Sequence, residues 1–390
     1  MPDFISTFGV RNGMKFLILT GICAFFSSQL LANAPETHSN SAEKHVSHAS
    51  EAVTAHGEHA TADEPIGKKV SKMILGHIGD NHDWDAFGHI VVLPLPIILY
   101  TESQGLQVFM SSNFHHGHEP HNGFMMINDG AKIVWQDPSK TEKIWDFSIT
   151  KIAATIILGS IFMIFIFIGV AKAYAKRKGQ APKGFQNLIE TMFVFMRDGV
   201  IKSSVGPRYK EFMPLLMTIF WFIFIVNLMG NIPFFPGGAN ATGNIAIPLV
   251  LAAVILYYIT IKANKHYWKH IFMPDVPVAL YILLIPIEIL GFFLRPFVLM
   301  LRLFANITAG HIIILGFFSL IFIFGSSKAW VGYSVGVPSV AFTVFMGMLE
   351  LLVAFLQAFV FTLLSSLYIG MAIEDHGHHD HDHAHATEKH

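Results

Sequence analysis

The sequence is poor in charge and has almost no cysteine. Only 14% of its 390 residues are charged, against about 25% in a typical soluble domain, while 53% are hydrophobic. The formal net charge of −1 lacks the basic excess of a nucleic-acid-binding protein, so we expect no nucleic-acid partner. The single cysteine, Cys23, excludes a disulfide framework. The composition therefore indicates a membrane protein.

Motifs of enzymatic chemistry are missing as well. The chain has no H-E-x-x-H, no G-x-S-x-G and no nucleotide-binding loop. We therefore expect no catalytic residue and no cofactor. Histidines crowd residues 38–59, 115–121 and 376–390. Such tracts can bind zinc, nickel or copper, or serve as weakly binding tails, and we predict no metal site.

The N-terminus has the signature of a secretory signal peptide. Arg11 and Lys15 lead into a short apolar run, and residues 32–34 read Ala-Asn-Ala, which fits a cleavage site. We predict a signal peptide at residues 1–34, with a retained first helix as the alternative. Residues 35–83 are rich in histidine and lack an apolar period, so we predict a disordered segment.

Residues 84–146 predict a small β-rich cap outside the membrane. The apolar run at residues 90–100 is only eleven residues long and contains two prolines, so it is too short to span and is expected to be extended. Asn-Asp-Gly at residues 128–130 separates two short apolar runs, at residues 124–127 and 133–135. This pattern is typical of a β-hairpin with a tight turn.

Long apolar runs fill residues 147–373, the predicted membrane domain. Fifty residues of straight helix would measure about 75 Å, whereas the hydrocarbon core is about 30 Å thick. The two longest runs must therefore be broken, strongly tilted or partly in the membrane plane, with Pro286 and Pro296 as plausible bends in the first of them. We predict five spans, at residues 149–171, 212–232, 244–261, 274–324 and 339–373, with a loop at residues 325–338.

Charges in the loops predict the orientation. Lys172, Lys176 and Lys183 follow the first span, and positive loops stay in the cytoplasm. The N-terminus is then outside, and the His/Asp-rich tail at residues 374–390 is cytoplasmic. Residues 185–201 mix apolar and charged side chains, which predicts an amphipathic helix on the cytoplasmic face. The predicted fold class is an all-α membrane protein with about five transmembrane helices, two of them long and tilted.

Arg302 lies inside the fourth apolar run. An arginine at mid-bilayer costs about 2.5–3.5 kcal/mol and keeps its charge, so either a function or a structural pairing must compensate. At 100° per residue, Asn306 shares the face of Arg302. Glu288 projects about 40° to the other side, while His311 points about 180° away and lies about 13 Å further along the axis.

The fifth run supplies a partner for His311. Glu350 and Gln357 are seven residues apart, so they lie on one stripe of a helix. Counted from the outer loop, Glu350 and His311 lie at similar depth. Both groups can gain or lose a proton, so the pair could relay protons. A buried structural hydrogen bond is the alternative.

Residues 301–311, Leu-Arg-Leu-Phe-Ala-Asn-Ile-Thr-Ala-Gly-His, resemble the signature of the a-subunit of the F-type ATP synthase. Residues 356–361 and 227–233 resemble two further segments of that family, and the similarity covers about residues 147–373. The resemblance implies a stator that embraces a rotating ring of small hairpin subunits, each with one membrane carboxyl. It implies two offset half-channels for protons, separated by an arginine, which Arg302 matches.

The other polar residues also match positions in the family. His311 and Glu350 match the outer half-channel pair, Asn306 and Gln357 match polar residues near the arginine, and Glu288 matches an inner half-channel position. Further implied partners are a peripheral-stalk subunit and the rest of the complex, in a bacterial inner membrane. ATP chemistry would then reside on partner subunits. A stand-alone secondary transporter or ion channel is the competing hypothesis, although no internal repeat supports it.

Overall fold

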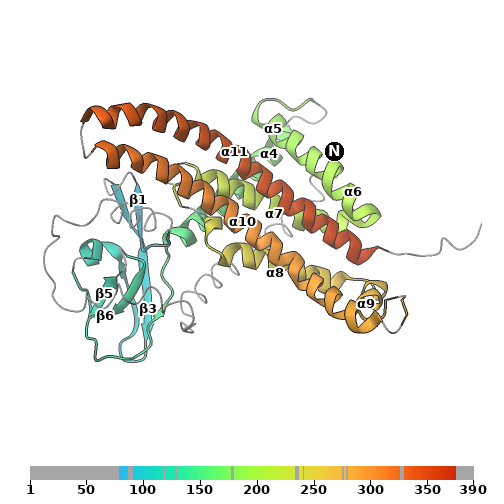
Figure 1. The fold of residues 1–390 in the computed structure, drawn as a ribbon, viewed down its shortest axis with the longest axis horizontal. Helices are drawn as coiled ribbons and strands as arrows, with labels where there is room; N and C mark the ends of the chain where they lie inside the picture. The colour runs from blue at the N-terminus through green and yellow to red at the C-terminus, as the bar shows by residue number, and fades with distance from the viewer. Residues whose placement is uncertain are drawn as a thin grey trace, which may run out of the picture.

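The computed structural model describes residues 79–86, 91–117, 119–127, 130–176, 180–232, 237–239, 241–274, 276–277, 280–325 and 329–374. The predicted signal peptide, most of the predicted His-rich segment and almost all of the C-terminal tail lie outside these residues. Within them, a β part (residues 79–148) precedes a larger helical part. The β part lies towards the end of the molecule where α10 ends and α11 begins (Figure 1).

Antiparallel strands build the β part. β1 pairs with β2, β3 lies between β4 and β7, and β5 pairs with β6. The last pair joins Phe124 to Trp135 in register, in agreement with the predicted hairpin, although turn residues 128 and 129 lie outside the described residues. β2 and β3 are extended within the run at residues 90–100. The strands are β1 (Asp83–Ala86), β2 (Val91–Pro94), β3 (Pro96–Thr101), β4 (Gly105–Met110), β5 (Phe124–Ile127), β6 (Lys132–Trp135) and β7 (Trp145–Asp146), with a 3-10 helix, η3 (Ser111–Gly117), after β4.

Helices make up the rest of the described chain. They are α4 (Lys151–Lys176), α5 (Phe185–Val194), the π-helix η4 (Phe195–Ile201), α6 (Lys202–Val205), the 3-10 helix η5 (Gly206–Arg208), α7 (Tyr209–Gly230), the 3-10 helix η6 (Ala241–Gly243), α8 (Ala246–Lys262), α9 (Lys265–Phe272), α10 (Tyr281–Gly325) and α11 (Ala329–Ile373). A helix is thus present over the predicted amphipathic segment, and its place at a membrane face stays a prediction.

The described helices are long and apolar enough to cross a membrane at 4 places, or up to 5 if α8 and α9 form one span bent by 102°. This supports a mostly helical, multi-pass membrane protein with about five spans. α7 forms the core, since its residues are buried on nearly all sides, as expected of a helix that is apolar all round. Phe220 and Phe224 of α7 pack edge-on against Phe355 of α11.

The two long helices run antiparallel, side by side (Figure 1). α10 has 45 residues and stays continuous through Pro286 and Pro296. A broken helix, one of the three predicted alternatives, is therefore excluded. At 1.5 Å per residue it is about 68 Å long, so tilting or lying partly in the membrane plane remains.

The predicted loop at residues 325–338 is wrong. α11 begins at Ala329 and also has 45 residues, with Pro338 inside it. A proline removes one backbone hydrogen bond but is tolerated where a neighbouring helix packs against the chain. Here the rings of Phe317 and Phe342 lie 4.0 Å apart between their centroids.

Candidate functional site

Arg302 projects from the side of α10 that is turned away from the core. Its side chain is exposed, as is that of Asn306. The residues that directly follow each of them, Leu303 and Ile307, are buried. The predicted common face of Arg302 and Asn306 is therefore present. Within the described ranges, no carboxylate forms an ion pair with Arg302. The guanidinium is thus available to a charged group from outside the chain.

Apolar side chains surround this arginine. α10 and α11 are the least buried of the candidate spans, in contrast to α7. A guanidinium amid uncovered apolar side chains fits a surface that contacts lipid or another membrane subunit, rather than water. The exposed apolar residues near Arg302 on α10 are Phe293, Leu294, Phe297, Val298 and Leu301.

His311 and Glu350 meet between the two long helices. The Nδ1 atom of His311 and the Oε1 atom of Glu350 are 3.0 Å apart, and the side chains are 17% and 6% exposed. This confirms the predicted pairing. The contact lies at ion-pair distance, and Oε1 accepts no hydrogen bond from the residues that the structure describes. A Cβ at position 310 would come within 3.1 Å of Oε1, so Gly310 leaves the room that Glu350 occupies.

The other side of the His311 ring faces the end of α7. A Cβ at Gly230 would lie 3.8 Å from the Nε2 atom of His311 and 3.4 Å from the carbonyl oxygen of Ala239. One turn earlier on α7, Asn227 accepts a hydrogen bond of 2.6 Å from the buried hydroxyl of Thr242. His311 is therefore reached from α7 and from the residues that follow it, as well as from α11.

Two buried amides in this region were missed by the sequence reasoning. The side-chain nitrogens of Asn227 and Asn231 are buried and have no hydrogen-bond partner among the described residues. An unpaired buried donor costs about 1–3 kcal/mol, and ordered water commonly satisfies such groups. The available signal was the pair of asparagines around Gly230 at the end of an apolar run, but spacing alone does not place that end beside His311.

The remaining two predicted residues lie elsewhere. Gln357 is buried on α11, two turns after Glu350. Glu288 is half-buried on α10, about 21 Å along the axis from Arg302, so the two are not neighbours. Two turns after Glu288 on α10, Arg295 donates a hydrogen bond of 3.3 Å to the hydroxyl of Tyr267. The polar groups of α10 are therefore spread along the helix axis.

In the described part of the chain, no group of three or more His, Cys, Asp or Glu side chains is placed to hold a metal ion.

Comparison with known families decides the assignment of the helical part. The family described as ATP synthase A chain matches residues 152–370, more than half of the chain. The chain belongs to the ATP synthase A chain family. The resemblance of residues 301–311 to the a-subunit of the F-type ATP synthase is thereby confirmed. All six predicted site residues lie within the family match.

Relatives in the family are similar over the same part of the chain. An ATP synthase subunit a of Chloroherpeton thalassium is 42% identical over 242 residues, which are 60% of this chain and 69% of that protein. An ATP synthase subunit a 2 of Chlorobaculum tepidum is 43% identical over 63% of this chain and 69% of its own length. A third, from Prosthecochloris aestuarii, is 43% identical over 60% and 71%. Residues 73–148 match a different family, described only as a domain of unknown function, DUF8433.

Proposed function

We propose that the chain is the ion-translocating stator subunit of a rotary ATP synthase, in which Arg302 separates two offset half-channels. The observation that carries the proposal is an arginine with no ion-pair partner in the described chain, on an exposed apolar face. The half-channels would lead protons to and from the carboxyls of a rotating ring of hairpin subunits. ATP chemistry resides on other subunits, and this chain supplies no catalytic group.

The charge of Arg302 explains how the two paths stay separate. A guanidinium keeps its proton, since its pKa exceeds about 12. It favours the ionised form of an arriving ring carboxyl by about 4 kcal/mol at 4 Å, for an effective dielectric constant of about 20. Each ring carboxyl must therefore release its proton before it passes. Asn306, on the same face, and Gln357 would line this passage.

The outer half-channel would run past the end of α7 to His311 and Glu350. The unpaired amides of Asn227 and Asn231 support a hydrated path, because water satisfies such groups. The Nδ1 atom of His311 and the Oε1 atom of Glu350 lie 3.0 Å apart, close enough for a proton to pass between the two side chains. Glu288, at the other end of α10, would serve the inner half-channel.

The geometry of the long helices suits this division. Two helices of 45 residues that lie obliquely in the membrane carry polar groups at different depths and at different places along the ring. We place the N-terminus and the β part outside a bacterial inner membrane, and the helix over residues 185–201 and the C-terminus on the cytoplasmic side. A peripheral-stalk subunit and the rest of the ATP synthase complete the partners.

Replacement of the arginine tests the proposal. In the assembled complex, Arg302→Ala is expected to abolish ATP-driven proton pumping into membrane vesicles and to leave the complex assembled. Arg208→Ala is the matched control, because Arg208 is an exposed arginine that pairs with Glu211 within the chain. Pumping by Arg302→Ala at the rate of that control would overturn the assignment.

A further inference from the structure

We propose that the β part positions the outer half-channel, through a hydrogen bond from Trp84 to the residues that follow α7. The proposal rests on the proposed function, because it concerns proton access to His311. Trp84 is then a positioning residue, which acts on the path through other residues. It also gives a role to a region that matches only a domain of unknown function.

Trp84 joins two parts of the chain that are far apart in sequence. Its indole Nε1 donates a buried hydrogen bond of 3.0 Å to the carbonyl oxygen of Gly237, 153 positions later. The side chain is 1% exposed and packs against Leu95 of the β part and Ala154 of α4. A buried indole needs a partner for its N–H group, so this bond fixes residue 237 to the β part.

Gly237 in turn lies tightly against the end of α7. A Cβ at this position would overlap the carbonyl oxygens of Met229 and Ile232, so only glycine fits. Two residues later, Ala239 is fully buried, and its carbonyl oxygen shares the space beside Gly230 with the Nε2 atom of His311. A displacement of residue 237 would therefore shift the backbone that lies beside His311.

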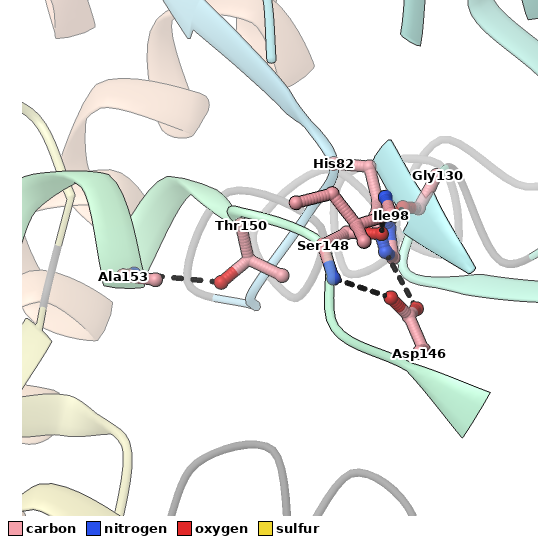
Figure 2. Close-up of polar contacts among 7 residues, drawn as sticks. All are labelled: His82, Ile98, Gly130, Asp146, Ser148, Thr150 and Ala153. Atoms are coloured by element: carbon pink, nitrogen blue, oxygen red, sulfur yellow. Dashed lines mark hydrogen bonds and ion pairs between the residues drawn. The ribbon is translucent and has the colours of Figure 1, made fainter. Parts of the chain in front are cut away.

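The two residues 81 and 82, which shortly precede Trp84, are themselves held by several contacts. His82 makes a contact of 2.7 Å from Nδ1 to the carbonyl oxygen of Gly130, and one of 2.9 Å from Nε2 to Oδ2 of Asp146 (Figure 2). A carbonyl and a carboxylate both accept, so both ring nitrogens donate and the imidazole is protonated. The backbone of Lys151 donates to the carbonyl oxygen of Asn81 at 2.8 Å. Residues 81–84 are thus fixed between the β5–β6 hairpin and the start of α4.

This chain of contacts predicts a specific effect on transport. If Trp84 releases Gly237, the backbone beside His311 loses its fixed position while α10 and α11 keep theirs. Proton entry from the outer side should slow and its pH dependence should change, because the surroundings of His311 change. Assembly with the ring should persist, since the exposed face around Arg302 is untouched.

The experiment compares two indole donors in the assembled complex. Trp84→Phe removes the N–H group and keeps most of the ring. Trp135→Phe is the control, because the Trp135 indole donates a bond of 2.9 Å to the carbonyl oxygen of Glu142 within the β part. We expect Trp84→Phe to slow passive proton conduction by the membrane sector severalfold, because the segment beside His311 loses its hydrogen bond to the β part. The pH midpoint of conduction from the outer side should also shift.

A direct probe of the backbone accompanies this comparison. Ala239→Cys places a thiol in the buried segment, and a water-soluble thiol reagent should label it faster when Trp84→Phe is present than when Trp135→Phe is. Equal conduction, pH midpoint and labelling in the two backgrounds would overturn the inference, as would loss of the Trp84→Phe complex from the membrane. The Arg302→Ala complex separates the two claims: if it fails to pump, the proposed function stands whatever Trp84 does.

Discussion

At the residue scale, the contact between His311 and Glu350 joins two groups that can each hold a proton. The Nδ1 atom of His311 and the Oε1 atom of Glu350 are 3.0 Å apart, and both side chains are largely buried. A proton can pass between an imidazole and a carboxyl at this distance, so the pair suits a relay as well as a structural contact. The room that Gly310 leaves for the carboxylate keeps this contact close.

Glu350→Gln is expected to slow proton flux through the complex by about tenfold or more, because an amide keeps the shape of the carboxyl but cannot take up and release a proton. ATP-driven pumping and passive conduction both measure this rate. Glu190→Gln is the control, since Glu190 on α5 also has a buried carboxylate oxygen that accepts no hydrogen bond from the described residues. An unchanged flux in Glu350→Gln would remove Glu350 from the path.

The predicted positions of residues were correct where the regular spacing of a helix decides them. A rotation of 100° per residue placed Arg302 and Asn306 on one face, and counting from the outer turn brought His311 level with Glu350. The buried amides of Asn227 and Asn231 required knowledge of which helix end lies beside α10, which depends on tertiary packing. The place of Glu288 relative to Arg302 depends on whether the helix continues through the two prolines, which the sequence left open. α10 is continuous through both of them.

At the element scale, the connection between the β part and α4 depends on titratable groups. Burial opposes protonation of His82, but the hydrogen bond and charge of Asp146 and the carbonyl of Gly130 outweigh it and raise the pKa of His82 above 6.5. Burial acts to raise the pKa of Asp146, yet hydrogen bonds from His82 and Ser148 hold it below 3.8. Burial raises the pKa of Asp80 above 3.8, so Asp80 also makes the folded state more stable at acidic pH than at higher pH.

The signs of these shifts predict a pH window for the β part. The His82 contribution to stability is fully present below pH 6.5 and is lost as the pH rises through the raised pKa of His82. The Asp146 contribution is present above pH 3.8 and is lost as the pH falls through its lowered pKa. We therefore expect protection of the β part from proteolysis to decline as the pH rises above 6.5.

Substitution isolates the group responsible for this decline. His82→Gln should give weaker protection that depends less on pH, because glutamine does not titrate and the contribution of His82 is removed. His121→Gln is the matched control, since His121 packs against Phe109 in the same part of the chain and has no carboxylate partner at ion-pair distance in the described residues. Wild-type protection that stays constant across this pH range would contradict the prediction.

The error at residues 325–338 shows which element boundaries the sequence leaves undetermined. Glycine and Pro338 favoured a loop by local rules, but packing against α10 holds the chain helical through the proline. A Cβ at Gly332 would come within 2.7 Å of the Cα atom of Gly325, so the two helices touch at their glycines. The glycines thus mark a close helix contact, and the proline lies one to two turns inside it.

At the scale of the whole molecule, α10 and α11 present a long apolar surface with a permanent positive charge in it. α7 is almost entirely enclosed by the chain, whereas most of α10 and α11 is not. A membrane protein that transported a substrate alone would be expected to enclose its costly charge within its own helices or a hydrated cavity. This chain leaves Arg302 exposed, as the stator proposal requires.

The stator proposal therefore predicts that the chain alone does not conduct. Reconstituted by itself into liposomes, it should give no proton flux above that of empty liposomes, because no moving carboxyl carries a proton from one half-channel to the other. Reconstituted with the hairpin ring as the membrane sector, it should conduct, and Arg302→Ala should alter that conduction. The control is the ring alone, which lacks both half-channels. Selective flux of any ion or solute through the chain alone would favour a stand-alone transporter, since an independent path needs its binding site and its gate on one polypeptide.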